Sequence, residues 1–116
     1  SYRNTVRLFA GEKCFGPGVA QLLRHVQEFH SLRSAAKAMN MAYSKAWRII
    51  RTAETVFGCK LLSSTIGGAH GGGAVLTPEA ERLLAAYEAY CADVGTYAQG
   101  KFEDAFRFYR DLDHRP

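Results

Sequence analysis

The sequence has 116 residues and a formal net charge of +4, a length that suits one domain built around a single hydrophobic core. No apolar run has the length of a membrane span or the layout of a signal peptide, so we expect a cytoplasmic protein with no membrane partner. The three cysteines lie far apart and outside any cysteine–histidine cluster, which argues against a disulfide framework, a zinc site and any other cofactor. Without paired carboxylates or a Ser/His/Asp arrangement, the sequence does not predict an enzyme.

The first residues predict a small β-hairpin followed by a helix. Apolar and basic residues partly alternate from Tyr2 to Phe9, and Gly11-Glu12-Lys13 is a turn sequence before Cys14-Phe15. The triplet Gly16-Pro17-Gly18 then breaks the chain. Residues Val19 to His30 follow with an apolar stripe at helical spacing, and this helix should pack beneath the next two.

The stretch from Ser31 to Gly58 organises the rest of the chain. Behind Ser31 as an N-cap, four apolar residues fall at i, i+3, i+4 and i+7: Leu32, Ala35, Ala36 and Met39. After an interruption at Asn40 a second helical stripe runs to Gly58 as its C-terminal cap: Ala46, Ile49, Ile50, Ala53 and Phe57. Two helices that meet at a tight corner predict a helix-turn-helix.

Positive charge is concentrated on this stretch. Residues Ser31 to Lys60 hold six lysines and arginines against the single acid Glu54, a net charge of +5. If the apolar stripe of the second helix points inward, its opposite face carries Tyr43, Ser44, Trp47, Arg48 and Arg51. A basic face of this kind suits a DNA groove, although many charge runs are only solvated helix surfaces.

Beyond Gly58 the pattern favours a β-hairpin with a glycine-rich tip, in the position of a wing. The segment KLLSSTI from Lys60 favours extended structure, and Ala74 to Thr77 can return antiparallel to it. Wing contacts are placed at Gly68, His70 and Gly72, where a glycine backbone can approach a phosphate closely. The glycine run lacks the Lys-Ser/Thr of a nucleotide-binding P-loop.

Thr77-Pro78-Glu79 predicts the start of a long helix, with Thr77 as N-cap and Pro78 at the first helical position. Apolar residues keep helical spacing as far as Tyr97, which is more length than a three-helix core can cover. We expect Gly100 to interrupt this helix and a short final helix to carry Phe102, Ala105, Phe106, Tyr109 and Leu112. Both helices would form a self-association surface, or else fold back on their own core.

The run SLRSAAKAMNMAYSKAWRIIR, the glycine-rich wing and LTPEAERLLAAYEAY together resemble one known family. From about Val6 to Tyr90 the sequence is similar to the N-terminal winged-helix domain of ModE-type, molybdate-dependent transcriptional regulators, which are themselves similar to LysR-type DNA-binding domains. The predicted fold is mainly α with small β elements, a winged helix-turn-helix. It comprises a hairpin at 1–16, a core and wing at 17–77, and dimerisation helices at 78–116.

The resemblance implies a homodimer that binds double-stranded operator DNA arranged as an inverted repeat and regulates transcription, as a repressor of molybdate-related genes. The candidate DNA-binding residues are Arg33, Ser34, Lys37, Tyr43, Ser44, Lys45, Trp47, Arg48 and Arg51. Among them Ser44, Trp47 and Arg48 should reach base edges, while Lys37 and Arg51 should contact phosphates. The alternative for Trp47 is a structural role, in which it is a plug that stabilises the fold.

The sequence departs from the family in three places. Ser63-Ser64-Thr65 stands where the family has an Arg-Arg pair in its wing, and Ala42 stands where a serine usually caps the recognition helix. The family prototype continues into oxyanion-binding domains, whereas this sequence ends at Pro116. We therefore expect no molybdate site here. Either the sensor is absent, a separate effector-sensing protein supplies it as a partner, or the regulator responds to another signal. The missing wing arginines leave a second hypothesis open, a protein–protein interaction module that binds DNA without sequence preference.

Overall fold

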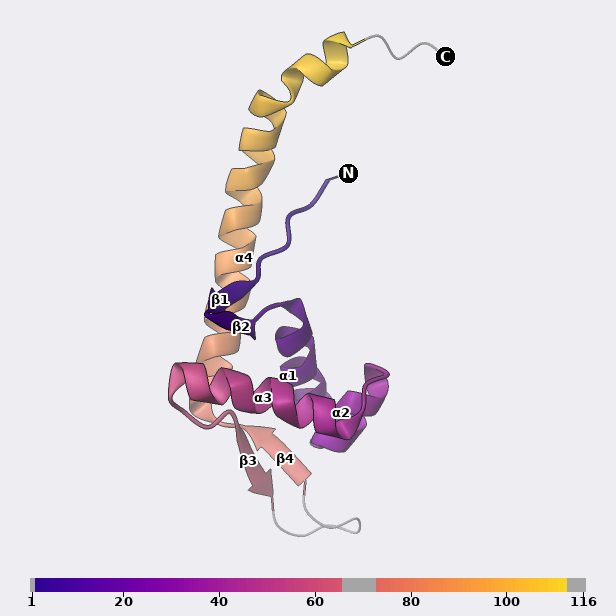
Figure 1. Cartoon of the computed structure of the whole chain (residues 1–116), viewed down its shortest axis with the longest axis vertical. Coiled ribbons are helices and arrows are strands. Elements are labelled where there is room, and N and C mark those ends of the chain that lie inside the picture. The colour runs from indigo at the N-terminus through magenta and orange to yellow at the C-terminus, as the bar shows by residue number, and fades with distance from the viewer. Residues whose placement is uncertain (1, 66–72, 113–116) are drawn as a thin grey trace.

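A computed structural model describes residues 2–65 and 73–112 of the chain (Figure 1). The elements in chain order are β1 (Leu8–Ala10), β2 (Glu12–Phe15), α1 (Pro17–Phe29), α2 (Leu32–Ala38), α3 (Tyr43–Phe57), β3 (Leu62–Thr65), β4 (Gly73–Leu76), α4 (Pro78–Ala105) and the short 3₁₀ helix η1 (Arg107–Asp111). Two antiparallel hairpins, β1–β2 and β3–β4, flank the helices. This arrangement confirms the predicted winged helix-turn-helix.

The N-terminal hairpin is present, but its first strand begins only at Leu8. The chain turns at Gly11, which has a φ of +81°, a value that glycine adopts without strain. Strand β2 then carries Cys14 and Phe15 into the core, where both are buried. The hairpin thus covers the core beside α3 and does not stand apart from it.

The core lies among α1, α2 and α3. Each predicted stripe supplies fully buried residues, among them Leu22, Leu23, Ala35, Ala46 and Ile50. Ser31 caps α2 as predicted, since its hydroxyl accepts a hydrogen bond from the Ser34 N–H at 3.1 Å. Small residues at the crossing allow α2 and α3 to approach closely.

The wing is tied to the helices at its base. The Ala74 N–H donates to the carbonyl of His30, which ends α1, at 2.9 Å. Thr77 joins the other side, because its hydroxyl donates to the Lys60 carbonyl at 2.7 Å and accepts from the Ala80 N–H at 3.1 Å. Strands β3 and β4 are therefore held on α1 and α4. The predicted tip contacts Gly68, His70 and Gly72 lie outside the described residues.

Helix α4 is longer than predicted, and the expected interruption at Gly100 is wrong. The helix runs unbroken to Ala105, and only then does the chain tighten into η1. A glycine inside a helix costs about 1 kcal/mol but does not end it. Here the side chains of Gln99 and Glu103 also bridge the glycine with a hydrogen bond of 3.2 Å.

The second half of α4 does not fold back on the core but extends away from it (Figure 1), in a molecule of 64 × 32 × 23 Å. The N-terminal segment contacts both halves of α4. The Tyr87 hydroxyl donates to the Val6 carbonyl at 2.7 Å, and the Tyr2 ring lies 4.4 Å from that of Phe102. Among the described residues, no helix is both long and apolar enough to cross a membrane.

Candidate nucleic-acid interface

The solvent face of α3 carries the predicted side chains. Its opposite face is fully buried through Ala46, Ile50 and Ala53. Six of the nine predicted DNA contacts lie on α3: Tyr43, Ser44, Lys45, Trp47, Arg48 and Arg51. Trp47 is half-buried, and the other five are exposed. The other three, Arg33, Ser34 and Lys37, are exposed on α2. The tight corner brings Arg33 and Ser34 of α2 beside Tyr43 and Trp47 of α3, where the four line one hollow.

Helix α3 begins without a side-chain cap, as the sequence indicates. Ala42 has extended backbone angles and offers only its carbonyl, which accepts from the N–H groups of Lys45 and Ala46 at 3.0 and 3.1 Å. The first N–H groups of the helix consequently lack a side-chain acceptor from the N-cap residue. An exposed helix start of this kind favours an anion nearby.

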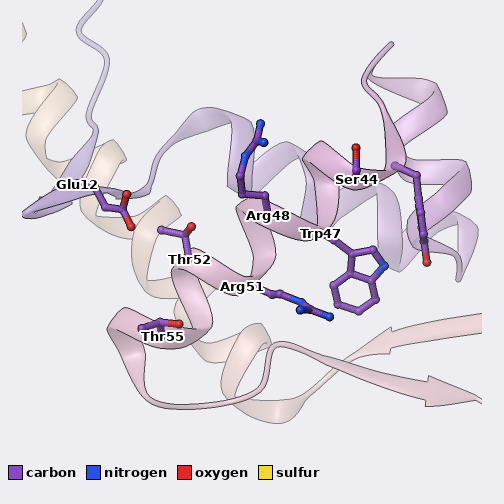
Figure 2. Close-up of a pocket in the computed structure, with 8 residues that line it drawn as sticks. Glu12, Ser44, Trp47, Arg48, Arg51, Thr52 and Thr55 are labelled. Carbon is purple, nitrogen blue, oxygen red and sulfur yellow. The ribbon is translucent and has the colours of Figure 1, made fainter.

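The exposed face of α3 has two edges. Figure 2 shows Ser44 and Arg48 pointing to one side of the helix, and Trp47 and Arg51 pointing to the other, toward the wing. An open depression of about 610 Å³ runs along the helix between Tyr43 and Thr55 and is lined by both edges. Side chains four residues apart share an edge because they are one helical turn apart.

A line of aromatic and cationic contacts connects α2 to α3. The Arg33 guanidinium lies over the Tyr43 ring, 4.2 Å from its centroid. Tyr43 meets Trp47 edge to face at 6.3 Å, and the Arg51 guanidinium lies 5.4 Å from the Trp47 ring centre. Such contacts are attractive because a positive charge faces the electron-rich side of the ring. We call this set of four residues the cation–aromatic row.

Between α3 and the wing lie two adjoining hollows, which we together call the wing groove. Both are lined by Trp47, Leu62, Ser63 and Ser64. On the α2 side, where Arg33 and Ser34 add to the wall, its volume is about 520 Å³. On the side of Arg51 and Lys60 it is about 1000 Å³.

The acid near the turn from α3 to the wing, Glu54, is occupied by the backbone. The Glu54 carboxylate accepts the N–H of Leu61 at 2.9 Å and so fixes the turn that leads from α3 to the wing. Glu54 is absent from the ion pairs found among the described residues, as are the arginines of α2 and α3. The basic charge therefore remains available to an anionic partner.

Comparison with known proteins identifies the family. Residues 19–81, which include α2, α3 and the wing, match the family described as bacterial regulatory helix-turn-helix protein, lysR family. The chain belongs to this family. The matched region contains every predicted contact on α2, α3 and the wing.

Individual relatives of this lysR-family chain bear regulatory and molybdenum-related names. It is 36% identical over 73 residues to the molybdenum-pterin-binding protein MopB of Rhodobacter capsulatus, covering 63% of this chain and 27% of that protein. The identity is 36% over 72 residues with the transcriptional regulator ModE of Haemophilus influenzae and 33% over 72 residues with the transcriptional dual regulator ModE of Escherichia coli K12. Each of these two alignments covers 62% of this chain and 28% of the regulator.

The geometry adds residues that the sequence reasoning missed. Thr52 and Thr55 continue the depression along α3, and spacing at i+4 from Arg48 and Arg51 would have found them. Glu12 of the N-terminal hairpin also lines the depression. No local pattern points to Glu12, since only the packing of β2 on α3 brings it there.

Proposed function

We propose that this lysR-family chain binds double-stranded DNA sequence-specifically and regulates transcription, with α3 as its recognition helix. The observation that carries the proposal is the exposed basic face of α3, whose arginines have no carboxylate partner among the ion pairs of the described residues. An α-helix of this kind fits the major groove of B-DNA. A regulator of the bacterial chromosome would act in the cytoplasm.

The two edges of α3 would divide the work of recognition. Ser44 and Arg48 point away from the wing and are placed to read base edges, with Arg48 as a bidentate donor to guanine. Arg51 and Lys37 are exposed and would contact phosphates, which give affinity without sequence preference. Trp47 turns toward the wing and packs partly on the core, so it would add stability as well as contact area.

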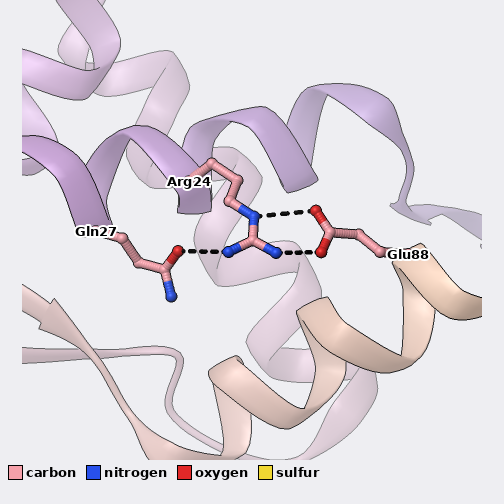
Figure 3. Close-up of polar contacts among 3 residues, drawn as sticks. All are labelled: Arg24, Gln27 and Glu88. Atoms are coloured by element: carbon pink, nitrogen blue, oxygen red, sulfur yellow. Dashed lines mark hydrogen bonds and ion pairs between the residues drawn. The ribbon is translucent and has the colours of Figure 1, made fainter.

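We further propose that the chain acts as a two-fold dimer through α4. Aromatic side chains from the middle of α4 outward are exposed, such as Tyr90 at 49% and Tyr97 at 67%, and a helix face of this kind usually needs a partner. Figure 3 shows how α4 is joined to α1: Arg24 Nε donates to Glu88 Oε2 at 3.0 Å, and Nη2 donates to Oε1. The Arg24 hydrogen bonds hold the pKa of the Glu88 carboxyl below its usual range.

Dimerisation through an anchored helix would set the distance between the two recognition helices. Two copies of α3 about 34 Å apart would read half-sites one helical turn apart in an inverted repeat. Sedimentation at micromolar concentration tests the dimer, and a monomer throughout that range would contradict it.

DNA binding is tested by selection from a pool of random duplexes. We expect the pool to converge on an inverted repeat that random DNA competes for poorly. Binding without any enriched sequence would instead support the second hypothesis, a winged-helix interaction module with only non-specific DNA affinity. That hypothesis draws on Ser63 and Ser64, which leave β3 without the basic pair of the related family.

A link to molybdenum rests on the relatives alone. One of them is named for molybdenum-pterin binding, and this chain spans about three tenths or less of the relatives it matches. We propose that the regulated genes serve molybdenum metabolism and that molybdate itself does not bind the matched region. Calorimetry with the 116-residue chain should show only weak, salt-sensitive binding, and tight stoichiometric binding of molybdate would contradict this.

A further inference from the structure

The cation–aromatic row ends at both sides of the wing groove. Arg33 lines the part of the groove next to α2, and Arg51 lines the part next to the start of β3. Trp47 lines both parts and lies between the two arginines. The row therefore places one guanidinium in each of the two adjoining hollows of the wing groove.

The ring contacts in the row restrict the conformations of Arg33 and Arg51 without occupying their N–H donors. An exposed arginine has many rotamers, and holding its planar group over a ring reduces their number. The N–H groups at the edge of the guanidinium stay free for a phosphate, which accepts two of them at once. A carboxylate partner would instead consume those donors, and neither arginine has one among the ion pairs of the described residues.

The opposite wall of the groove is suited to the same ligand. Ser63 and Ser64 are exposed on β3, and their hydroxyl groups can donate to phosphate oxygens. Lys60 adds a positive charge near Arg51. Among the described residues that line the groove, the single acid is Glu54, whose carboxylate accepts the Leu61 N–H.

We propose that Tyr43 and Trp47 are positioning residues, which hold Arg33 and Arg51 along the wing groove for contacts with the phosphates of the DNA backbone. The inference rests on the proposed DNA binding and assigns the backbone to a particular surface. It also gives β3 a role in DNA binding that needs no arginine in the wing.

The chain contains one tryptophan, Trp47, so its fluorescence reports directly on the groove. With a random-sequence duplex as the probe, we expect bound DNA to reduce acrylamide quenching of the indole. Anisotropy of a labelled duplex measures binding in the same samples. If the anisotropy rises while quenching stays as in the free protein, the groove assignment is wrong, whereas no rise at all would contradict the proposed function itself.

Affinity measurements at several salt concentrations test the two arginines. Arg33→Ala and Arg51→Ala should each lower the slope of log affinity against log salt by about 0.9, the value for one phosphate contact. Lys101→Ala is the matched control, because Lys101 also lies over a ring, that of Tyr97, 5.6 Å from its centroid, but on the distant half of α4. An Arg33→Ala slope equal to that of the control would overturn the assignment of Arg33.

A double-mutant cycle tests the positioning role of Tyr43. Tyr43→Leu should weaken binding to the random duplex about two- to five-fold in the wild-type chain, the range expected for an exposed cation–π contact. It should have no further effect beside Arg33→Ala, and Tyr43→Phe, which keeps the ring, should bind nearly as the wild type does. Equal weakening by Tyr43→Leu with and without Arg33 would show that Tyr43 does not act through it.

A gain of charge tests the opposite wall without removing any contact. Ser63→Arg should strengthen binding to the random duplex and raise the salt slope by about 0.9. Gln99→Arg adds the same charge on the distant half of α4 and serves as the control. If both variants raise the slope equally, the wing is not close to the backbone.

Discussion

Thr77 should contribute more to stability than its position between two elements suggests, and Thr77→Val isolates the reason. Its side chain is buried, with 9% of the residue exposed. The hydroxyl makes two hydrogen bonds, one to the Lys60 carbonyl and one from the Ala80 N–H. Valine has nearly the same shape, so the substitution removes the hydroxyl but leaves almost no cavity.

The expected cost follows from those two bonds. Loss of an N-cap acceptor costs about 1 kcal/mol, and loss of the donor to the part-buried Lys60 carbonyl costs about 1–2 kcal/mol more. We therefore expect Thr77→Val to lower the free energy of unfolding by about 2–3 kcal/mol. With an m-value of about 2 kcal/mol per molar, the urea midpoint should fall by about 1–1.5 M. Because the Lys60 carbonyl leads into β3, DNA affinity should fall as well.

Urea unfolding followed by circular dichroism measures this cost, with Thr77→Ser as the matched control. Serine keeps the hydroxyl and loses only a methyl group, so its midpoint should fall by less than half as much. If Thr77→Val is as stable as Thr77→Ser, the hydroxyl bonds do not hold the wing base, and the reasoning is refuted. Equal m-values are required for the comparison.

Four further variants test other parts of the structure. Arg48→Ala should reduce the preference for the selected operator over random DNA by about 1–3 kcal/mol in competition titrations, and an unchanged ratio would remove its base-reading role. Gly73→Ala places a Cβ 2.5 Å from the His30 carbonyl oxygen, and it should destabilise the chain by about 1–3 kcal/mol in thermal melts. The Cβ of Gly95→Ala meets no atom within 4 Å, and this variant should stabilise the chain by about 0.5–1 kcal/mol in the same measurement. Burial first, and then the Cys91 thiol, raise the pKa of Tyr87 to about 12. Because the phenol proton is held more tightly in the folded chain than in the unfolded one, the stability that it contributes should be lost as the pH rises from about 10 to 12. Tyr87→Phe should show a smaller loss of stability over that pH range.

The helix boundaries and caps could be predicted because they depend on neighbouring residues. Ser31 and Thr77 cap their helices as predicted, and Ala42 begins α3 without a side-chain acceptor. The prediction failed at Gly100, where a local rule was applied too strongly. The cost of one glycine is small beside the hydrogen bonds of a helix of 28 residues.

The exposed face of α3 was predictable from the sequence, but the directions in which its side chains point were not. Helical periodicity separates the exposed side chains of α3 from buried Ile50 and Ala53, and the roles given to those exposed residues stay predictions. Periodicity does not show that Trp47 turns toward the wing while Arg48 turns away. That division depends on where β3 passes along the helix, which is set by contacts far apart in the sequence.

By itself, the sequence determined the elements, their order and the charge on α3, since each follows from spacing and composition over a few turns of helix. Only the tertiary structure decided which groups meet. Arg33 reaches Tyr43 across the corner between α2 and α3, and Arg24 reaches Glu88 across 64 positions of sequence. Such contacts form because packing of the apolar stripes fixes the distance and angle between helices, and that angle is a property of the assembled core and of no single segment.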